Sequence, residues 1–389
     1  MARIAPLDGP SIDQAAGSSS ARERLATIDW PPVALAAGAL LVLVWLGRDM
    51  TFYHDEFAFL LLRDLSLQGI FAPHNEHLSA TLVILYRTLV GTVGTVSYWP
   101  YLGVTFALHV IVSAIVYVVV RRETTAMWAL GAMAVMLVLG SGGDDILWAF
   151  QSGTVGATAA GMAAVVVAPR RPAVAGVLLA IALATSGAAF AFLVGTGLHL
   201  ALTRPRALAW LALPVGLYLA WLVTFGATRM VAMRSPSLDG VPDYVLAGLV
   251  ASAAGVLGSV LPLVGSVALL ALAFGIGWAR GLPPVVLALL ASSVAFFFFA
   301  GLVRAELGAE QAAAPRYIYV AAPGLLITGA VLLARIQRPW RDIVGVAVLA
   351  VALVGNVVLL VDSHDRFVSH IECERSLTPV ARGSAGNPC

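Results

Sequence analysis

Two short polar segments interrupt the first quarter of this apolar chain, and the first holds side chains suited to proton transfer. His54, Asp55 and Glu56 follow one another directly after an apolar stretch. A carboxylate at an apolar boundary loses hydration, which raises its pKa and its basicity. Such a group suits a general base that removes a proton from a hydroxyl. The competing interpretation is a charged first turn of a helix over 57–67. Asp55 and Glu56 are the catalytic candidates, with His54 beside them to bind substrate.

The second polar segment is His74-Asn75-Glu76-His77, which follows a proline. On a helix, residues three positions apart share one face, so His74 and His77 would hold a divalent metal together with Asp55 or Glu76. The alternatives are a helix N-cap with a charged first turn, or hydrogen bonds to substrate without metal. Because this spacing alone is weak evidence, we expect no required cofactor. A divalent cation, Mg²⁺ or Mn²⁺, is kept as the minority alternative.

A third polar group lies near the middle of the chain, where Asp144 and Asp145 precede Trp148 and Gln151. The indole ring suits stacking on a sugar ring or a lipid headgroup. The alternative is an aromatic anchor at the membrane interface beside solvated acids. The two aspartates are also a minority candidate for metal binding. We carry all four side chains forward as substrate-binding candidates.

Arginines near the last apolar segments suggest an anion site. Arg304 precedes an acidic loop, and Arg316 with Tyr317 opens the next apolar stretch. An arginine entering an apolar helix is costly unless it is paired or faces a polar cavity. Its planar fork suits a phosphate, whereas the alternative is snorkelling to the interface. The pattern favours phosphate binding at Arg316, with Arg87 as the next candidate.

These side chains need a scaffold, and the composition indicates a membrane protein. Hydrophobic residues make up 60% of the 389 residues, charged residues 11%, and the mean hydropathy is +0.92. Soluble domains are about 25% charged, so this chain lacks the charge to cover a water-facing surface. All 23 basic residues are arginine, a usage typical of a high-GC genome such as that of an actinobacterium. No basic run suits nucleic acid.

The apolar stretches predict an all-α, polytopic transmembrane bundle with about eleven spans. The predicted spans are 33–47, 99–120, 127–140, 153–168, 173–185, 188–202, 207–225, 261–279, 285–303, 317–334 and 342–361. Two further apolar segments, 77–94 and 244–259, are left over.

Charge predicts the orientation of the bundle. Five short loops hold ten arginines, whereas 15 of the 21 acidic residues fall in the alternate loops and the C-terminal tail. Arginine-rich loops face the cytoplasm, so Asp55 is outside and Arg121 inside, with one span between them. Segment 77–94 is therefore predicted to lie in the outer interface, and 244–259 to be re-entrant or interfacial. Residues 1–30 are a disordered cytoplasmic tail, 31–361 the plasma-membrane domain and 362–389 an extracytoplasmic tail.

The layout from 33 to 122 resembles the GT-C superfamily of membrane glycosyltransferases, such as protein O-mannosyltransferases and aminoarabinose transferases. The resemblance rests on Asp55-Glu56 in the first outer loop and on Pro73-His74-Asn75-Glu76-His77-Leu78 before an interfacial helix. The next span then ends at Arg121-Arg122. Three stretches (His-Asn-Glu-His-Leu, Trp-x-Phe-Gln and Arg-Tyr-x-Tyr) also resemble an actinobacterial family of membrane proteins without an assigned activity.

The resemblance implies an inverting glycosyltransferase with a GT-C-like fold. It would move a sugar from a polyprenyl-phosphate donor to a hydroxyl of an envelope glycan, lipid or protein outside the membrane. Asp55 would be the base, Asp144 or Asp145 a second outer acid, and Arg316 the phosphate ligand, helped by His77 or Arg87. The alternatives are a transporter or flippase of a lipid-linked substrate, which needs polar residues at mid-membrane, and a non-catalytic envelope-assembly protein on the same fold.

Overall fold

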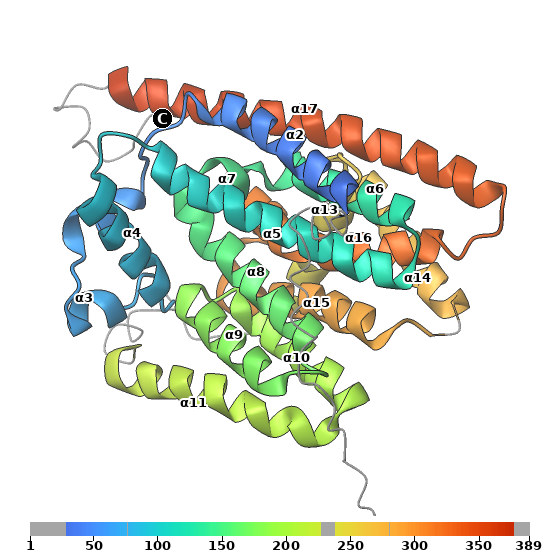
Figure 1. Ribbon diagram of the computed structural model, residues 1–389, viewed down its shortest axis with the longest axis horizontal. Coiled ribbons are helices and arrows are strands. Elements are labelled where there is room, and N and C mark those ends of the chain that lie inside the picture. The colour runs from blue at the N-terminus through green and yellow to red at the C-terminus, as the bar shows by residue number, and fades with distance from the viewer. Residues whose placement is uncertain (1–28, 76, 227–237, 280, 377–389) are drawn as a thin grey trace, which may run out of the picture.

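The computed structural model describes residues 29–75, 77–226, 238–279 and 281–376, and these residues are helical, without a β-sheet. The longer helices run along the length of the molecule (Figure 1). They are α2 (Trp30–Gly47), α5 (Trp99–Glu123), α6 (Ala126–Leu137), α8 (Ser152–Val167), α9 (Pro172–Thr185), α10 (Ala189–Thr203), α11 (Ala212–Trp221), α13 (Val241–Val256), α14 (Pro262–Trp278), α15 (Pro284–Arg304), α16 (Pro315–Leu333) and α17 (Trp340–Ser376). The predicted all-α class is confirmed.

Short elements join these helices. They are the π-helices η1 (Ala58–Leu62) and η5 (Leu222–Gly226), the helices α3 (Leu67–Phe71), α4 (Ala80–Val93) and α7 (Gly143–Leu147), and the 3₁₀ turns η2 (Gly140–Gly142), η3 (Ala149–Gln151), η4 (Pro205–Leu211), η6 (Ala305–Leu307) and η7 (Ala309–Ala313). In the region 57–67, where the competing interpretation placed a helix, the structure has the five-residue η1.

Eight described helical segments are long and apolar enough to cross a membrane. They are Trp30–Gly47, Trp99–Glu123, Ala126–Leu147, Ala149–Val167, Pro205–Gly226, Pro284–Leu307, Pro315–Leu333 and Trp340–Cys373. Three shorter apolar helices, α9, α10 and α14, match the other predicted spans. The remaining two, α4 and α13, match the segments predicted not to cross. The structure thus supports a multi-pass membrane bundle, while the count of eleven stays a prediction.

Small residues let neighbouring helices pack closely. A Cβ on Gly195 of α10 would lie 2.0 Å from the hydroxyl of Ser292 in α15, and one on Gly248 of α13 would lie 2.2 Å from the ring of Phe297. Close backbone approach of this kind is typical of membrane helices, because lipid provides no hydrophobic drive for association. Helix α16 lies at the centre of the bundle. In its most apolar 18-residue stretch, 83% of the residues are buried, compared with 28% in α2 and 22% in α17.

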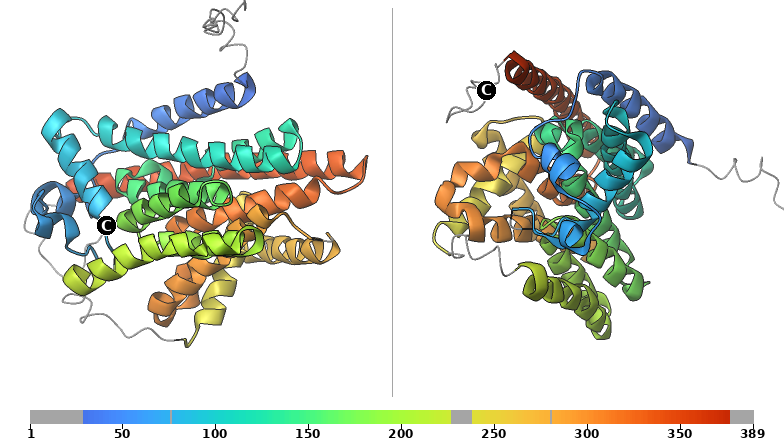
Figure 2. Two further views of the ribbon diagram at one scale, coloured as in Figure 1. Left: turned by 60° about the horizontal axis from the view of Figure 1, so that its bottom comes forward. Right: turned by 90° about the vertical axis from the view of Figure 1, so that its left-hand side faces the viewer.

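The bundle has two distinct ends. At one end Arg204 donates to the carbonyl of Pro169 over 2.8 Å, and Arg335 donates to the carbonyls of Ala279 and Gly281. The other end, where α2 finishes and α5 begins, is called the cavity end. Helices α3 and α4 lie there, off the main direction of the bundle (Figure 1). The right-hand view of Figure 2 shows α2 (dark blue) and α17 (red) along one edge of the bundle.

Helix α17 continues beyond residue 361, the predicted end of the membrane domain. It continues from Val361 to Ser376 without a break, so the first part of the predicted C-terminal tail is helix. This extension reaches the cavity end of the bundle. The predicted N-terminal tail, residues 1–30, lies outside the described residues except for its last two positions.

Candidate active site

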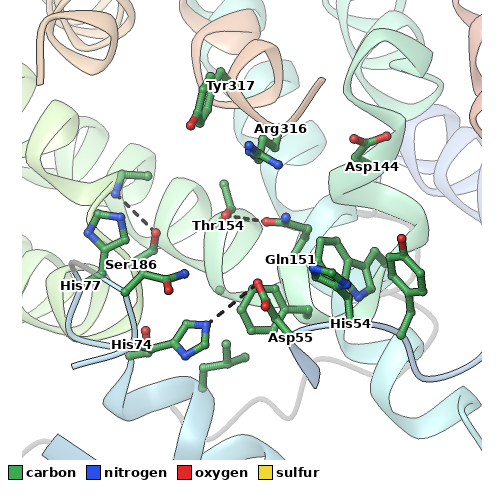
Figure 3. A pocket seen from close by; sticks show the side chains of 18 of the residues that line it. His54, Asp55, His74, His77, Asp144, Gln151, Thr154, Ser186, Arg316 and Tyr317 are labelled. Atoms are coloured by element: carbon green, nitrogen blue, oxygen red, sulfur yellow. Dashed lines mark hydrogen bonds and ion pairs between the residues drawn. The ribbon is translucent and has the colours of Figure 1, made fainter. Parts of the chain in front are cut away.

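A cavity of about 550 Å³ opens at the cavity end. Its walls come from the loop after α2, the turn before α4, the segment from α7 to α8, the ends of α9 and α15, the start of α16, and α17. Ten of the residues predicted from the sequence line it. They are His54, Asp55, His74, His77, Asp144, Trp148, Gln151, Arg304, Arg316 and Tyr317, and most of them are visible in Figure 3. Segments separated by more than 200 residues therefore meet in one place.

Asp55 and His74 face each other across the base of the cavity. The carboxyl Oδ2 of Asp55 lies 4.0 Å from Nε2 of His74, and the Asp55 side chain is 38% exposed (Figure 3). Burial lowers the pKa of His74, although the Asp55 charge raises it in part. A neutral imidazole leaves the Asp55 carboxylate without a full countercharge from His74. The Asp55 carboxyl lines the cavity, where a general base must be placed to reach its substrate.

The two polar segments hold strained backbones. His54 has a φ of 51° and Asn75 a φ of 50°, the positive-φ non-glycine residues of the described chain. Such conformations are uncommon outside glycine and cluster at functional sites. The backbone N–H groups of His74 and His77 each donate to the other's carbonyl at 3.0 Å. This segment is thus a tight turn, not the helical face that we expected for the two histidines.

Arg63 holds that turn in place, a role that its sequence position did not indicate. Its guanidinium donates to the carbonyls of Gly69, Ala72 and Pro73 at 2.7–3.2 Å. Three carbonyls from one irregular segment are satisfied by one planar cation, whose fork geometry suits such contacts. Glu76, the remaining candidate in this turn, lies outside the described residues.

Glu56, the second catalytic candidate, does not line the cavity. Its side chain is fully buried. It accepts hydrogen bonds from the Tyr53 backbone, the hydroxyls of Tyr86 and Tyr98, and the Trp148 indole at 2.6–3.2 Å. Burial raises the pKa of Glu56 to about 7, although these donors lower it. Glu56 therefore fixes the inner side of the cavity wall.

Trp148 and Gln151 form the middle of the cavity. The Trp148 ring packs against Tyr53, Phe150 and Phe367, with ring centroids 5.1–6.4 Å apart. The Gln151 amide oxygen accepts from the Thr154 hydroxyl at 2.7 Å (Figure 3). A fixed aromatic ring beside amide and hydroxyl groups is a suitable surface for a sugar, which has both apolar and hydroxyl faces.

Three arginines line the cavity. The guanidiniums of Arg304 and Arg316 lie 5.8 Å and 5.2 Å from the Tyr317 ring centroid. Arg366 of α17 also lines the cavity, where it pairs with Asp362 and donates to Ser363. Three guanidiniums from three helices thus surround one space, an arrangement that suits a phosphate.

Acidic residues near these arginines take different positions. Asp144 lines the cavity. Its carboxyl lies close enough to Arg366 and Arg316 to interact with their charges. Asp145 is fully buried behind it and does not line the cavity. Both Asp145 carboxyl oxygens lack a hydrogen-bond partner among the described residues.

Arg87 also lies away from the cavity. It donates to the Leu60 carbonyl at 3.0 Å and so attaches α4 to η1. A direct phosphate contact from Arg87 therefore has no support in this geometry.

Several lining residues were missed by sequence reasoning. They include Asn75, Thr154, Ser186, Arg366, Phe367 and His370. Single hydroxyls in apolar helices carry little signal, because they also bond to their own helix backbone. For Arg366 and His370, the one signal in the sequence was that the polar segment after residue 361 has no residue that would end the preceding helix.

Within the described chain, no group of three or more His, Cys, Asp or Glu side chains is placed to hold a metal ion. The imidazoles and Asp55 can form hydrogen bonds within the cavity.

The chain matches no protein-family model, no curated protein and no solved structure. Function must therefore be inferred from the site itself.

Proposed function

We propose that this protein is a membrane glycosyltransferase that moves a sugar from a polyprenyl-phosphate donor to an acceptor hydroxyl. The reaction takes place at the extracytoplasmic face of the plasma membrane, with the N-terminal side in the cytoplasm. The acceptor is a glycan, lipid or protein of the envelope. The single observation that supports this proposal most is that Asp55 and Arg316, 261 positions apart in the chain, line the same cavity.

The chemistry follows from the two sides of the cavity. Asp55 accepts the proton of the acceptor hydroxyl as its oxygen forms a bond to the anomeric carbon. The bond between that carbon and the donor phosphate breaks, and its electron pair leaves with the phosphate oxygen. Arg316 stabilises the charge that develops there, helped by Arg304 and Arg366. Attack from the face opposite the phosphate inverts the anomeric configuration.

The position of the cavity favours chemistry on one side of the membrane over transport. Its lining comes from the cavity end of the bundle, where α2 finishes and α16 begins. A transporter needs a binding site near mid-membrane that opens alternately to both sides. The described cavity residues belong to one end.

A donor panel tests the proposal. The purified protein is reconstituted into liposomes with polyprenyl phosphates that carry radiolabelled hexoses or pentoses, and release of free polyprenyl phosphate is measured with envelope extracts as acceptors. We expect release with one donor class, together with label in the acceptor fraction. Intact donors throughout the panel, in a protein that still binds them, would contradict the proposal.

A further inference from the structure

A second cavity of about 500 Å³ lies at the same end of the bundle, and the proposed reaction does not use it. Its lining includes Arg48, Asp49, Thr51, Ser97, Trp99 and Glu372. These residues come from the end of α2, the loop before α5, and the outer part of α17.

The two cavities share two structural elements. The loop after α2 contributes Thr51 to the second cavity and Asp55 to the first. Four residues of extended chain span about 14 Å at most. Helix α17 likewise contributes Arg366 and His370 to the first cavity and Glu372 to the second, from different faces of the same helix. The second cavity is therefore a close neighbour of Asp55.

A rigid wall separates the two spaces. Tyr98 lines the second cavity and Trp148 the first, and both side chains donate to the buried carboxyl of Glu56. The Tyr98 hydroxyl also accepts from the Ala149 backbone at 2.9 Å. Because these groups fix one another, the two cavities are separate spaces divided by a hydrogen-bonded wall.

The lining of the second cavity combines groups that recognise carbohydrate. Trp99 is 40% exposed and offers an aromatic surface for the apolar face of a sugar ring. Arg48 and Asp49, whose Nε and Oδ2 atoms lie 3.2 Å apart, and the exposed Glu372 offer planar donors and acceptors for neighbouring hydroxyls. Thr51 and Ser97 add further hydroxyl groups.

We propose that the second cavity is an acceptor subsite that binds sugar units of a glycan remote from the reacting hydroxyl. This inference rests on the proposed function and identifies the acceptor as a carbohydrate chain. Thr51 lies at most about 14 Å from Asp55, a distance that a short oligosaccharide can span.

Direct binding tests the subsite without any donor. The full-length protein in nanodiscs is titrated with mannose, glucose and galactose oligosaccharides of one to six units, and affinity is measured by calorimetry. We expect affinity to rise with length and then level off. The variants R48Q and E372Q should each weaken binding of the longer probes by about tenfold, which corresponds to a lost charged hydrogen bond. R338Q, an exposed arginine near the opposite end of α17, is the matched control.

The outcomes separate this subsite from the transfer reaction. Length-dependent binding that R48Q and E372Q weaken supports the subsite even where no donor is cleaved. Absence of oligosaccharide binding, affinity independent of length, or equal affinity in R48Q, E372Q and wild type would overturn it. Donor cleavage with a peptide or lipid acceptor that E372Q leaves unchanged would retain the glycosyltransferase and reject the carbohydrate subsite.

Discussion

The indole Nε1 of Trp148 donates a hydrogen bond to Oε2 of Glu56 over 3.2 Å. Trp148 lines the cavity, whereas Glu56 is fully buried behind it. The ring that we propose to contact the sugar is therefore oriented by an acid that the substrate does not touch. Glu56 is a positioning residue, and its protonation state is linked to the stability of the cavity wall.

The stability of the fold should depend on the ionisation of Glu56. Folding raises the pKa of this carboxyl from 4.5 to about 7, so the folded protein holds a proton that the unfolded chain releases between these values. The stabilisation is complete below pH 4.5 and is lost as pH rises through 7. Each pKa unit corresponds to about 1.4 kcal/mol, so the loss is about 3 kcal/mol.

The E56Q variant separates the contribution of Glu56 to stability from that of other titrating groups. Thermal unfolding in detergent is followed from pH 4.5 to 8, and the stability of E56Q is subtracted from that of wild type at each pH. We expect the difference, wild type minus E56Q, to fall as pH rises. A difference that stays flat, or one that increases with pH, would show that folding does not raise the pKa of Glu56.

Gly187 should be required for the position of His77. A Cβ at Gly187 would lie 2.4 Å from Nδ1 of His77, so G187A must displace the imidazole from the cavity. We expect the rate of transfer to fall at least about tenfold, because displacement of a positioned group by about 1 Å has effects of this size or larger. The protein should still fold. G91A is the matched control, because nothing lies within 4 Å of its Cβ. Equal activity in G187A and G91A would show that transfer does not depend on the position of His77.

Arg316 should bind the donor phosphate. Loss of a charged hydrogen bond costs about 1.5–3 kcal/mol, so R316A should weaken donor affinity by about 10- to 100-fold. R316K should recover part of this loss, because lysine keeps the charge without the planar fork. The measurement is competition of unlabelled donor against a fluorescent polyprenyl phosphate. Donor affinity that R316A leaves unchanged would assign the phosphate to other residues.

Chelation should leave transfer intact. The proposed steps use Asp55 and guanidiniums, and the described residues include no cluster of three metal-ligating side chains. Activity is compared before and after EDTA treatment in the same liposomes. Activity that disappears with EDTA and returns with Mg²⁺ or Mn²⁺ would restore the metal alternative for His74 and His77.

The sequence predicted the architecture well where long-range patterns decide it. Sustained apolar stretches are typical of membrane helices, and the described chain is a bundle of such helices. The orientation inferred from the arginine loops stays a prediction. Polar residues are costly in so apolar a chain, which is why His54, Asp55 and Arg316 stand out as site candidates from residue type alone.

Local geometry was harder to predict. Glu56 and Asp55 are adjacent, yet Glu56 is buried and Asp55 lines the cavity. The positive φ of His54 marks a tight turn immediately before them, which the sequence pattern does not reveal. The helical face expected for His74 and His77 is a turn held by Arg63. Arg366 reaches the cavity only because α17 continues past Val361, which local sequence does not reveal.

The most direct test of the proposed reaction compares D55N with wild type in liposomes loaded with a labelled polyprenyl-phosphate donor. D342N, an exposed aspartate at the other end of α17, is the control. We predict that D55N lowers transfer by about 10²- to 10⁴-fold, the usual worth of a general base, while donor affinity and D342N activity remain at the wild-type level. Transfer by D55N at the wild-type rate would contradict the assignment of Asp55 as the base, and with it the proposed mechanism.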